Sequence, residues 1–183
     1  MGKSAEHLRT AIAGEFNANR KYLEFAATAE SENLPNVAYL FRALAEAEAI
    51  HLKNHRQALG EDFVPPEEAF AIGTTLQNLE SAISGETYET TTMYPAFLKD
   101  LKKEQHTEQG KLGALSMQWA AKVELGHAKL LKQAMVALEG GQDLDLDQLW
   151  ICKVCGQILL QGEIAKSCPV CGHDVKYYQL LER

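Results

Sequence analysis

Apolar residues recur every three or four positions from residue 4 to about residue 139, among many Ala, Leu, Glu, Gln and Lys residues. This spacing places the apolar side chains on one face and is typical of long amphipathic helices. We therefore predict four helices, at roughly 4–31, 36–59, 75–103 and 106–139. Since each helix has one apolar face to bury, the pattern predicts an all-α four-helix bundle.

Breaks in the apolar pattern place the ends of these helices. Residues 31–35 form a short connection, so the first two helices should be antiparallel neighbours. Gly60 ends the second helix, and a longer segment with Pro65 and Pro66 then crosses to the third, with room for one short helix. Thr75 is expected to cap the third helix.

Polar residues interrupt the inward face of every predicted helix. The positions that should face the interior, taken helix by helix, are Leu8, Ile12, Glu15, Asn19, Tyr22 and Ala26; Val37, Phe41, Leu44, Glu48, His51 and His55; Leu76, Leu79, Ile83, Glu86, Glu89, Met93 and Phe97; and Met117, Ala120, Glu124, His127 and Leu131. In an ordinary bundle this stripe is apolar and the charged residues lie outside. Here the same kind of break recurs on all four helices.

Bound metal would explain these carboxylates. Burying each of them without a cation would cost on the order of several kcal/mol, and their mutual repulsion would add to the cost. Glu48 with His51, and Glu124 with His127, form two Glu-x-x-His pairs whose side chains share one helical face. Two such pairs with Glu on the other two helices are the pattern of di-iron and di-manganese bundles. The predicted ligands are Glu15, Glu48, His51, Glu86, Glu89, Glu124 and His127.

The alternative is that these Glu residues are solvated and the His residues belong to an ordinary core. For Glu86 or Glu89 taken alone, that interpretation is the better one. For the whole set it requires the helical register to fail on four helices at once. The remaining histidines, which lack a Glu three positions earlier, are expected to be structural or exposed: His7, His55, His106 and His173.

The end of the chain has a different pattern. Gly140-Gly141 and an acidic stretch break the helical period, so we predict a bundle domain at 1–141, a linker at 142–148 and a small domain at 149–183. So few residues cannot be stable from apolar burial alone. The small domain contains two C-x-x-C pairs, each followed by Gly: Cys152, Cys155, Cys168 and Cys171. This spacing predicts one tetrahedral metal, and by itself it favours a zinc ribbon.

Composition and charge limit the classes of partner that the protein could bind. The chain has 183 residues, 46% hydrophobic and 23% charged, with a formal net charge of −7 and a pI near 5.4. An acidic protein without a basic face does not fit a nucleic acid or an anionic membrane as its main partner. No apolar run resembles a secretory signal or a membrane span, and all four cysteines form C-x-x-C pairs. We therefore expect a cytoplasmic protein whose cysteines bind metal in a reducing compartment.

The chain resembles rubrerythrin over essentially its whole length. The segments that carry the resemblance are Glu15-Phe-Asn-Ala-Asn-Arg-Lys-Tyr22, Glu48-Ala-Ile-His51, Glu86-Thr-Tyr-Glu89 with Tyr94 beyond it, Glu124-Leu-Gly-His127, and the cysteine pairs. The resemblance implies a ferritin-like di-iron bundle followed by a rubredoxin-like domain. It implies that Glu48 and Glu124 bridge two irons, and that the four cysteines bind one iron, where spacing alone would favour zinc. The loop between the cysteine pairs is shorter than in free-standing rubredoxins.

The resemblance also implies that four side chains take part in the reaction. His51 would exchange with Glu89 at one iron as the oxidation state changes, and Tyr22 and Tyr94 would donate hydrogen bonds to ligand carboxylates. Five carboxylates leave a charge of +1 around two Fe(III) and −1 around two Fe(II), so replacing Glu89 by neutral His51 on reduction restores zero. Pro95, inside the third helix, should disturb the hydrogen-bond ladder beside this site.

The function implied is that of a reductive peroxidase in oxidative stress defence. Hydrogen peroxide would be reduced to water at the di-iron site, and electrons would arrive through the four-cysteine iron from an NAD(P)H-dependent reductase or a rubredoxin. At least twelve residues, about 18 Å of helix, separate His127 from the end of the fourth helix. We therefore expect a head-to-tail homodimer in which each cysteine domain serves the partner's irons. Two alternatives remain: a ferroxidase or iron-storage protein, and a bundle scaffold with a structural zinc ribbon.

Overall fold

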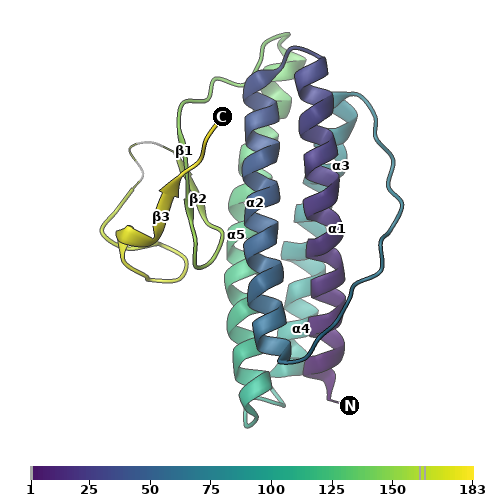
Figure 1. Ribbon diagram of the computed structural model, residues 1–183, viewed down its shortest axis with the longest axis vertical. Coiled ribbons are helices and arrows are strands. Elements are labelled where there is room, and N and C mark those ends of the chain that lie inside the picture. The colour runs from purple at the N-terminus through teal and green to yellow at the C-terminus, as the bar shows by residue number, and fades with distance from the viewer. Residues whose placement is uncertain (1, 161, 163) are drawn as a thin grey trace.

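The computed structural model describes residues 2–160, 162 and 164–183, and it confirms a four-helix bundle with a small β domain at its side (Figure 1). Helices α1 (Lys3–Ser31) and α2 (Pro35–Leu59) form an antiparallel pair, and α5 (Glu108–Glu139) is the last helix of the bundle. None of the helices in the described residues has the length and hydropathy needed to cross a bilayer.

The remaining helical rod consists of three segments in place of the single helix expected at 75–103. Helix α3 (Thr75–Tyr88) passes into a π-helical turn, η1 (Glu89–Met93), which continues as α4 (Tyr94–Leu101). The Tyr94 N–H donates to the Glu89 carbonyl, five residues back. Pro95 has no N–H and its ring crowds the preceding turn, so the wider π turn lets the rod continue. The expected disturbance of the hydrogen-bond ladder near Pro95 is confirmed. The sequence did not predict that it would take the form of a π-helical turn.

The crossing segment and the cap of α3 differ from expectation. Residues 61–74 form neither helix nor strand, so the short helix that this segment had room for is absent, in keeping with the adjacent Pro65 and Pro66. Thr74, not Thr75, is the N-cap: its hydroxyl accepts from the Gln77 N–H, and the Gln77 side chain accepts from the Thr74 N–H. This reciprocal capping box satisfies two free donors, and Thr75 becomes a buried first helical residue.

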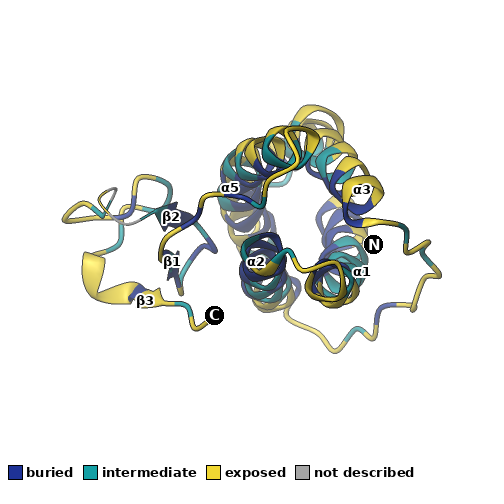
Figure 2. Cartoon of the chain, turned by 90° about the horizontal axis from the view of Figure 1, so that it is seen from above, coloured by how far each residue is buried: buried dark blue, intermediate teal, exposed yellow. Residues whose placement is uncertain are grey.

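The inward faces of the helices agree with the predicted stripe at most positions, as the buried residues lining the ring of helices show (Figure 2). Leu76 is the clear error, since its side chain is 37% exposed. Thr75, Leu79 and Ala82 define the buried face of α3, and Leu76 lies one residue away from it. Asn19 is half-buried and donates its amide to the Ala45 carbonyl of α2.

The start of α1 is capped from a distant part of the chain. The Glu104 carboxylate, in the turn after α4, accepts hydrogen bonds from the backbone N–H groups of Lys3 and Ser4. These donors have no partner inside the helix. We expect Glu104→Ala to lower the free energy of unfolding by about 1 kcal/mol, in the range of a lost cap. Urea unfolding of the variant beside Lys103→Ala, a neighbouring exposed position, measures this, and equal stability of the two would contradict the capping role.

The C-terminal domain is a three-stranded antiparallel sheet beside α2 and α5 (Figures 1 and 2). Its strands are β1 (Leu149–Cys152), β2 (Ile158–Leu160) and β3 (Tyr178–Leu180), in the order β2-β1-β3, with a 3₁₀ turn η2 (Val175–Tyr177) before β3. Leu149, Ile151 and Ile158 belong to the same apolar cluster as the upper bundle. The sheet is therefore docked on its own bundle.

The predicted linker at 142–148 follows the bundle surface and is held there. Leu144 and Leu146 are buried in the bundle cluster. The Asp143 carboxylate accepts hydrogen bonds from the N–H groups of Asn36 and Val37 at the start of α2. The chain thus turns back after α5, and the first cysteine loop returns to the level of His51. The cysteine domain therefore does not lie far from its own bundle centre, as the length of the last helix had led us to expect, because the chain reverses direction after α5.

Candidate metal centres

Four helical rods contribute side chains to two overlapping ligand clusters at the bundle centre. The first cluster is Glu15, Glu48, His51 and Glu124, and the second is Glu48, Glu86, Glu124 and His127. Within each cluster the potential ligand atoms all lie within 4.8 Å of one another. Every member is at most 1% exposed. Glu48 and Glu124 belong to both clusters, which is the arrangement expected of carboxylates between two metals.

The Glu-x-x-His spacing produces this convergence. His51 Nδ1 lies 2.9 Å from Glu48 Oε2 and 2.7 Å from Glu124 Oε1, so it faces carboxylates from two helices. His127 Nδ1 lies 2.6 Å from Glu124 Oε2 and 3.6 Å from Glu86 Oε2. One turn of helix separates Glu and His in each pair, and both side chains therefore point to the same interior space.

The chemistry of this donor set fits bound cations. Within the described chain, several buried oxygen and nitrogen atoms lie close to one another here but make no hydrogen bond of acceptable geometry: Glu15 Oε2, Glu48 Oε1, Glu86 Oε2, both Glu124 oxygens and both His127 nitrogens. Burial and the neighbouring carboxylates raise the pKa of Glu48 and of Glu124 well above the ordinary value. Burying these groups away from water carries a large desolvation cost. Coordination of a metal by the same atoms would offset that cost. The iron cofactors expected from the sequence therefore suit the bundle centre.

Glu89 and His51, the expected exchange pair, occupy different positions. His51 lies inside the first cluster, whereas Glu89 lies outside both, half-buried in the π turn. Glu89 borders two surface pockets between α1 and the crossing segment, beside Gly14. A Cβ atom at Gly14 would lie 3.9 Å from Glu89 Oε1, so the Glu89 carboxylate lies close beside this glycine. The structure thus places His51 near the centre and Glu89 toward the surface.

Tyr22 and Tyr94 both donate hydrogen bonds to cluster carboxylates. The Tyr22 hydroxyl is 2.6 Å from Glu86 Oε1, and the Tyr94 hydroxyl donates to Glu15 Oε1. Both hydroxyls are deeply buried, and burial together with the nearby carboxylates raises the pKa of each well above the ordinary value. They are therefore neutral donors that occupy one oxygen of each carboxylate and leave the other facing the centre.

His55 is the functional candidate that sequence reasoning missed. It is completely buried and lies 3.0 Å from the Tyr94 hydroxyl. Burial is the largest single influence and would raise the pKa of Glu15, but His55, His51 and a hydrogen bond with Glu48 together outweigh it, and the pKa falls to about 2. Its place on the inward stripe, one turn after His51, was the available sign. The other three histidines lie elsewhere: His7 is stacked on Phe97, His106 is exposed and His173 contacts Trp119.

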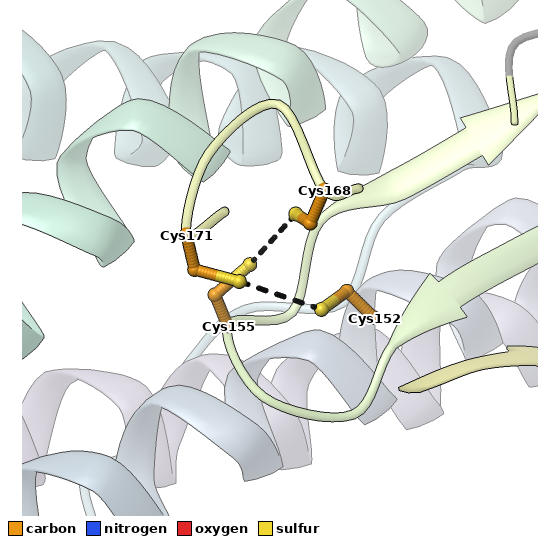
Figure 3. A group of neighbouring side chains, drawn as sticks. All are labelled: Cys152, Cys155, Cys168 and Cys171. Atoms are coloured by element: carbon orange, nitrogen blue, oxygen red, sulfur yellow. Dashed lines mark hydrogen bonds between the residues drawn. The ribbon is translucent and has the colours of Figure 1, made fainter. Parts of the chain in front are cut away.

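The four cysteines form the second centre (Figure 3). Cys155 Sγ lies 3.6 Å from Cys168 Sγ, and Cys152 Sγ lies 3.8 Å from Cys171 Sγ. These distances are far longer than the roughly 2.05 Å of a disulfide, and all four thiols are free. Gly156 and Gly172 follow the pairs with φ of 84° and 74°, values that favour glycine and close both turns. The group has the size and ligands of one tetrahedral metal site.

A direct contact joins the two centres. His51 Nε2 is 3.0 Å from the Cys155 carbonyl oxygen, so one imidazole ring spans from the cysteine loop to the carboxylate cluster. The Asn54 amide donates to the Val154 carbonyl at 2.8 Å, and Lys153 pairs with Glu46. Gly156 is essential to this approach, since a Cβ there would lie only 2.7 Å from His51 Nε2.

Comparison with known proteins agrees with both centres. The family profile described as Rubrerythrin matches residues 6–135, and the one described as Rubrerythrin, rubredoxin-like domain, matches residues 150–179. Rubrerythrin-2 of Clostridium acetobutylicum is 35% identical over 92% of this chain and 91% of its own length. Nigerythrin of Nitratidesulfovibrio vulgaris is 34% identical over 93% of this chain and 83% of its own length. A solved structure of fully reduced, all-ferrous nigerythrin covers 99% of this chain and 88% of its own, with a TM-score of 0.85 and 30% identity.

Proposed function

This chain belongs to the rubrerythrin family, and we propose that it reduces hydrogen peroxide to water at the bundle centre with electrons that enter through the four-cysteine iron. The observation that best supports the proposal is the position of His51. Its Nδ1 faces Glu48 and Glu124, while its Nε2 contacts the carbonyl of Cys155. A storage protein or a scaffold has no need of such a connection between two metal sites.

We assign the ligands from the two clusters. Glu15, Glu48, Glu124 and His51 would hold one iron, and Glu48, Glu86, Glu124 and His127 would hold the other. Glu89 would take the place of His51 as a ligand in the oxidised protein, which would keep the buried charge near neutral in both states. When bound, the two irons would supply the two electrons that the reduction of peroxide needs.

The overall reaction is H₂O₂ + 2e⁻ + 2H⁺ → 2H₂O, in which the O–O bond breaks and each oxygen becomes water. The chain's own residues provide access and containment. Peroxide reaches the centre past Glu89, from the pockets beside Gly14 and the crossing segment. Tyr22 and Tyr94 retain their hydroxyl protons and donate hydrogen bonds to Glu86 and Glu15, so these two carboxylates stay oriented through turnover.

Electrons enter at the cysteine centre from an NAD(P)H-dependent reductase or a rubredoxin. Cys171 is the only one of the four cysteines that is not buried, so the donor would approach the cysteine site on the side of Cys171. On the opposite side, the Cys155 carbonyl contacts His51 and leads to the di-iron centre. The four-cysteine iron must therefore cycle between oxidation states, which zinc cannot do.

The assay is NADH oxidation by the iron-loaded protein with an added reductase and hydrogen peroxide. We expect peroxide-dependent turnover that is lost when zinc replaces iron in the cysteine site, while peroxide still oxidises the chemically reduced di-iron centre. Oxygen-driven iron oxidation without NADH turnover would support the ferroxidase alternative. Zinc in the cysteines of protein as isolated, with no turnover, would support the scaffold alternative.

Cytoplasmic location and the head-to-tail dimer stay predictions. The distance between a cysteine domain and its own bundle centre no longer supports the dimer, since the cysteine loop contacts His51 of the same chain. Small-angle scattering of the iron-loaded protein tests it: we expect the mass of two chains, and a single-chain mass at micromolar concentration would contradict the dimer.

A further inference from the structure

A buried histidine outside both ligand clusters stands behind one of the ligand carboxylates. His55 is 0% exposed, and its ring contacts polar groups from three other helices. Nε2 is 3.0 Å from the Tyr94 hydroxyl of α4 and 3.5 Å from Glu15 Oε1 of α1. Nδ1 is 3.0 Å from the Ser116 hydroxyl of α5. The proposed reaction makes no use of this ring.

The direction of these hydrogen bonds follows from the number of protons. The Tyr94 hydroxyl has one hydrogen and donates it to Glu15, so toward His55 it can only accept. Nε2 of His55 therefore carries a hydrogen. Nδ1 of His55 lies 3.0 Å from the Ser116 hydroxyl, whose single hydrogen also has the Gly113 carbonyl within reach at 3.1 Å. The part of the network that the proton count fixes runs from His55 through Tyr94 to Glu15, and each donor polarises the next.

We propose that His55 is a positioning residue that holds the Tyr94 hydroxyl on Glu15 and thereby weakens the donation of that carboxylate to its iron. The proposal rests on the assignment of Glu15 as an iron ligand. With its lone pair occupied by His55, the tyrosine hydroxyl cannot rotate away without leaving a buried donor unpaired. A carboxylate that accepts a strong hydrogen bond shares less charge with a metal, which favours the ferrous state.

The other half of the centre provides an internal comparison. Tyr22 donates to Glu86 as Tyr94 donates to Glu15. Around Tyr22, however, the described ring neighbours are Phe25, Phe41 and Lys21, and no histidine stands behind its hydroxyl among the residues that the structure describes. The two irons would thus have unequal carboxylates, and His55 would act only on the one that Glu15 holds.

A double-mutant cycle tests the proposal on iron-loaded full-length protein. The measured quantities are the midpoint potential of the di-iron centre and the rate at which a chelator removes its iron. Substitution of outer partners commonly changes metal affinity 10- to 100-fold. We expect His55→Leu to lower the potential and to change the rate of iron loss about tenfold, as Tyr94→Phe does. In the Tyr94→Phe background His55→Leu should add nothing, whereas in the Tyr22→Phe background its effect should persist.

Two control variants keep the outcomes distinct. His7→Leu removes another buried histidine, one that pairs with Asp100 away from both clusters, and should leave the potential unchanged. His55→Gln retains an N–H donor and should restore part of the shift. An unchanged potential in His55→Leu, or an equal shift with and without Tyr94, would overturn the proposal. The potential is measurable whether or not peroxide is the substrate, so a failure of the peroxidase assay does not affect this result.

Discussion

Glu124→Gln should remove both irons from the bundle while the four-cysteine iron stays bound. Glu124 is 0% exposed and belongs to both ligand clusters, and its two oxygens lie 2.7 Å from His51 Nδ1 and 2.6 Å from His127 Nδ1. Glutamine has the same shape but no charge, and its amide nitrogen cannot act as a ligand. Loss of a shared ligand should cost more than the 10- to 100-fold typical of outer partners, so we expect peroxide turnover to fall at least about 100-fold.

Metal analysis and the visible spectrum of the cysteine site measure this outcome. Glu139→Gln is the matched control, since it makes the same change at an exposed position of the same helix. If Glu124→Gln retained a full complement of bundle iron, Glu124 would not be the shared ligand.

Gly156→Val should separate the two centres without emptying either. Gly156 has a φ of 84°, and a Cβ there would lie 2.7 Å from His51 Nε2 and 3.3 Å from the Ala47 carbonyl oxygen. Steric and backbone strain of about 1–3 kcal/mol would shift the docking equilibrium about 5- to 150-fold toward a detached cysteine domain. We expect NADH-driven turnover to fall by a similar factor, while peroxide oxidises the chemically reduced di-iron centre at nearly the normal rate.

Gly172→Val is the control for backbone strain. Gly172 occupies the equivalent turn with a φ of 74°, and nothing lies within 4 Å of its Cβ position. Both variants strain a cysteine loop, but only the first pushes against His51. Equal turnover in the two variants would mean that electrons do not pass through this contact.

The sequence predicted the bundle and most of its interior because burial repeats with the helical period. Glu15, Glu48 and Glu124 stand on that repeat, and an acidic residue in an apolar stripe is visible without a structure. The exposed Leu76 was wrongly placed inside because an apolar residue next to the buried face gives nearly the same helical pattern as a residue on that face. The choice between Thr74 and Thr75 as cap depended on one reciprocal contact with Gln77 that either residue could have made.

Features that depend on long-range packing could not be predicted in this way. The π turn at Glu89 was not specified by Pro95, which predicts only a disturbance. The docking of the cysteine domain depends on Leu144 and Leu146, which lie in a stretch whose acidic residues suggested a free linker. His55 was set aside because it lacks a Glu three residues earlier, although its partner Tyr94 comes from a different helix.

Anomalous diffraction at the iron and zinc absorption edges, on crystals of protein purified without added metal, would identify the metal bound at each centre. We expect two iron peaks between Glu48 and Glu124 and one iron peak among the four cysteine sulfurs. A bundle centre with no metal peak and with these carboxylates turned outward to solvent would contradict it.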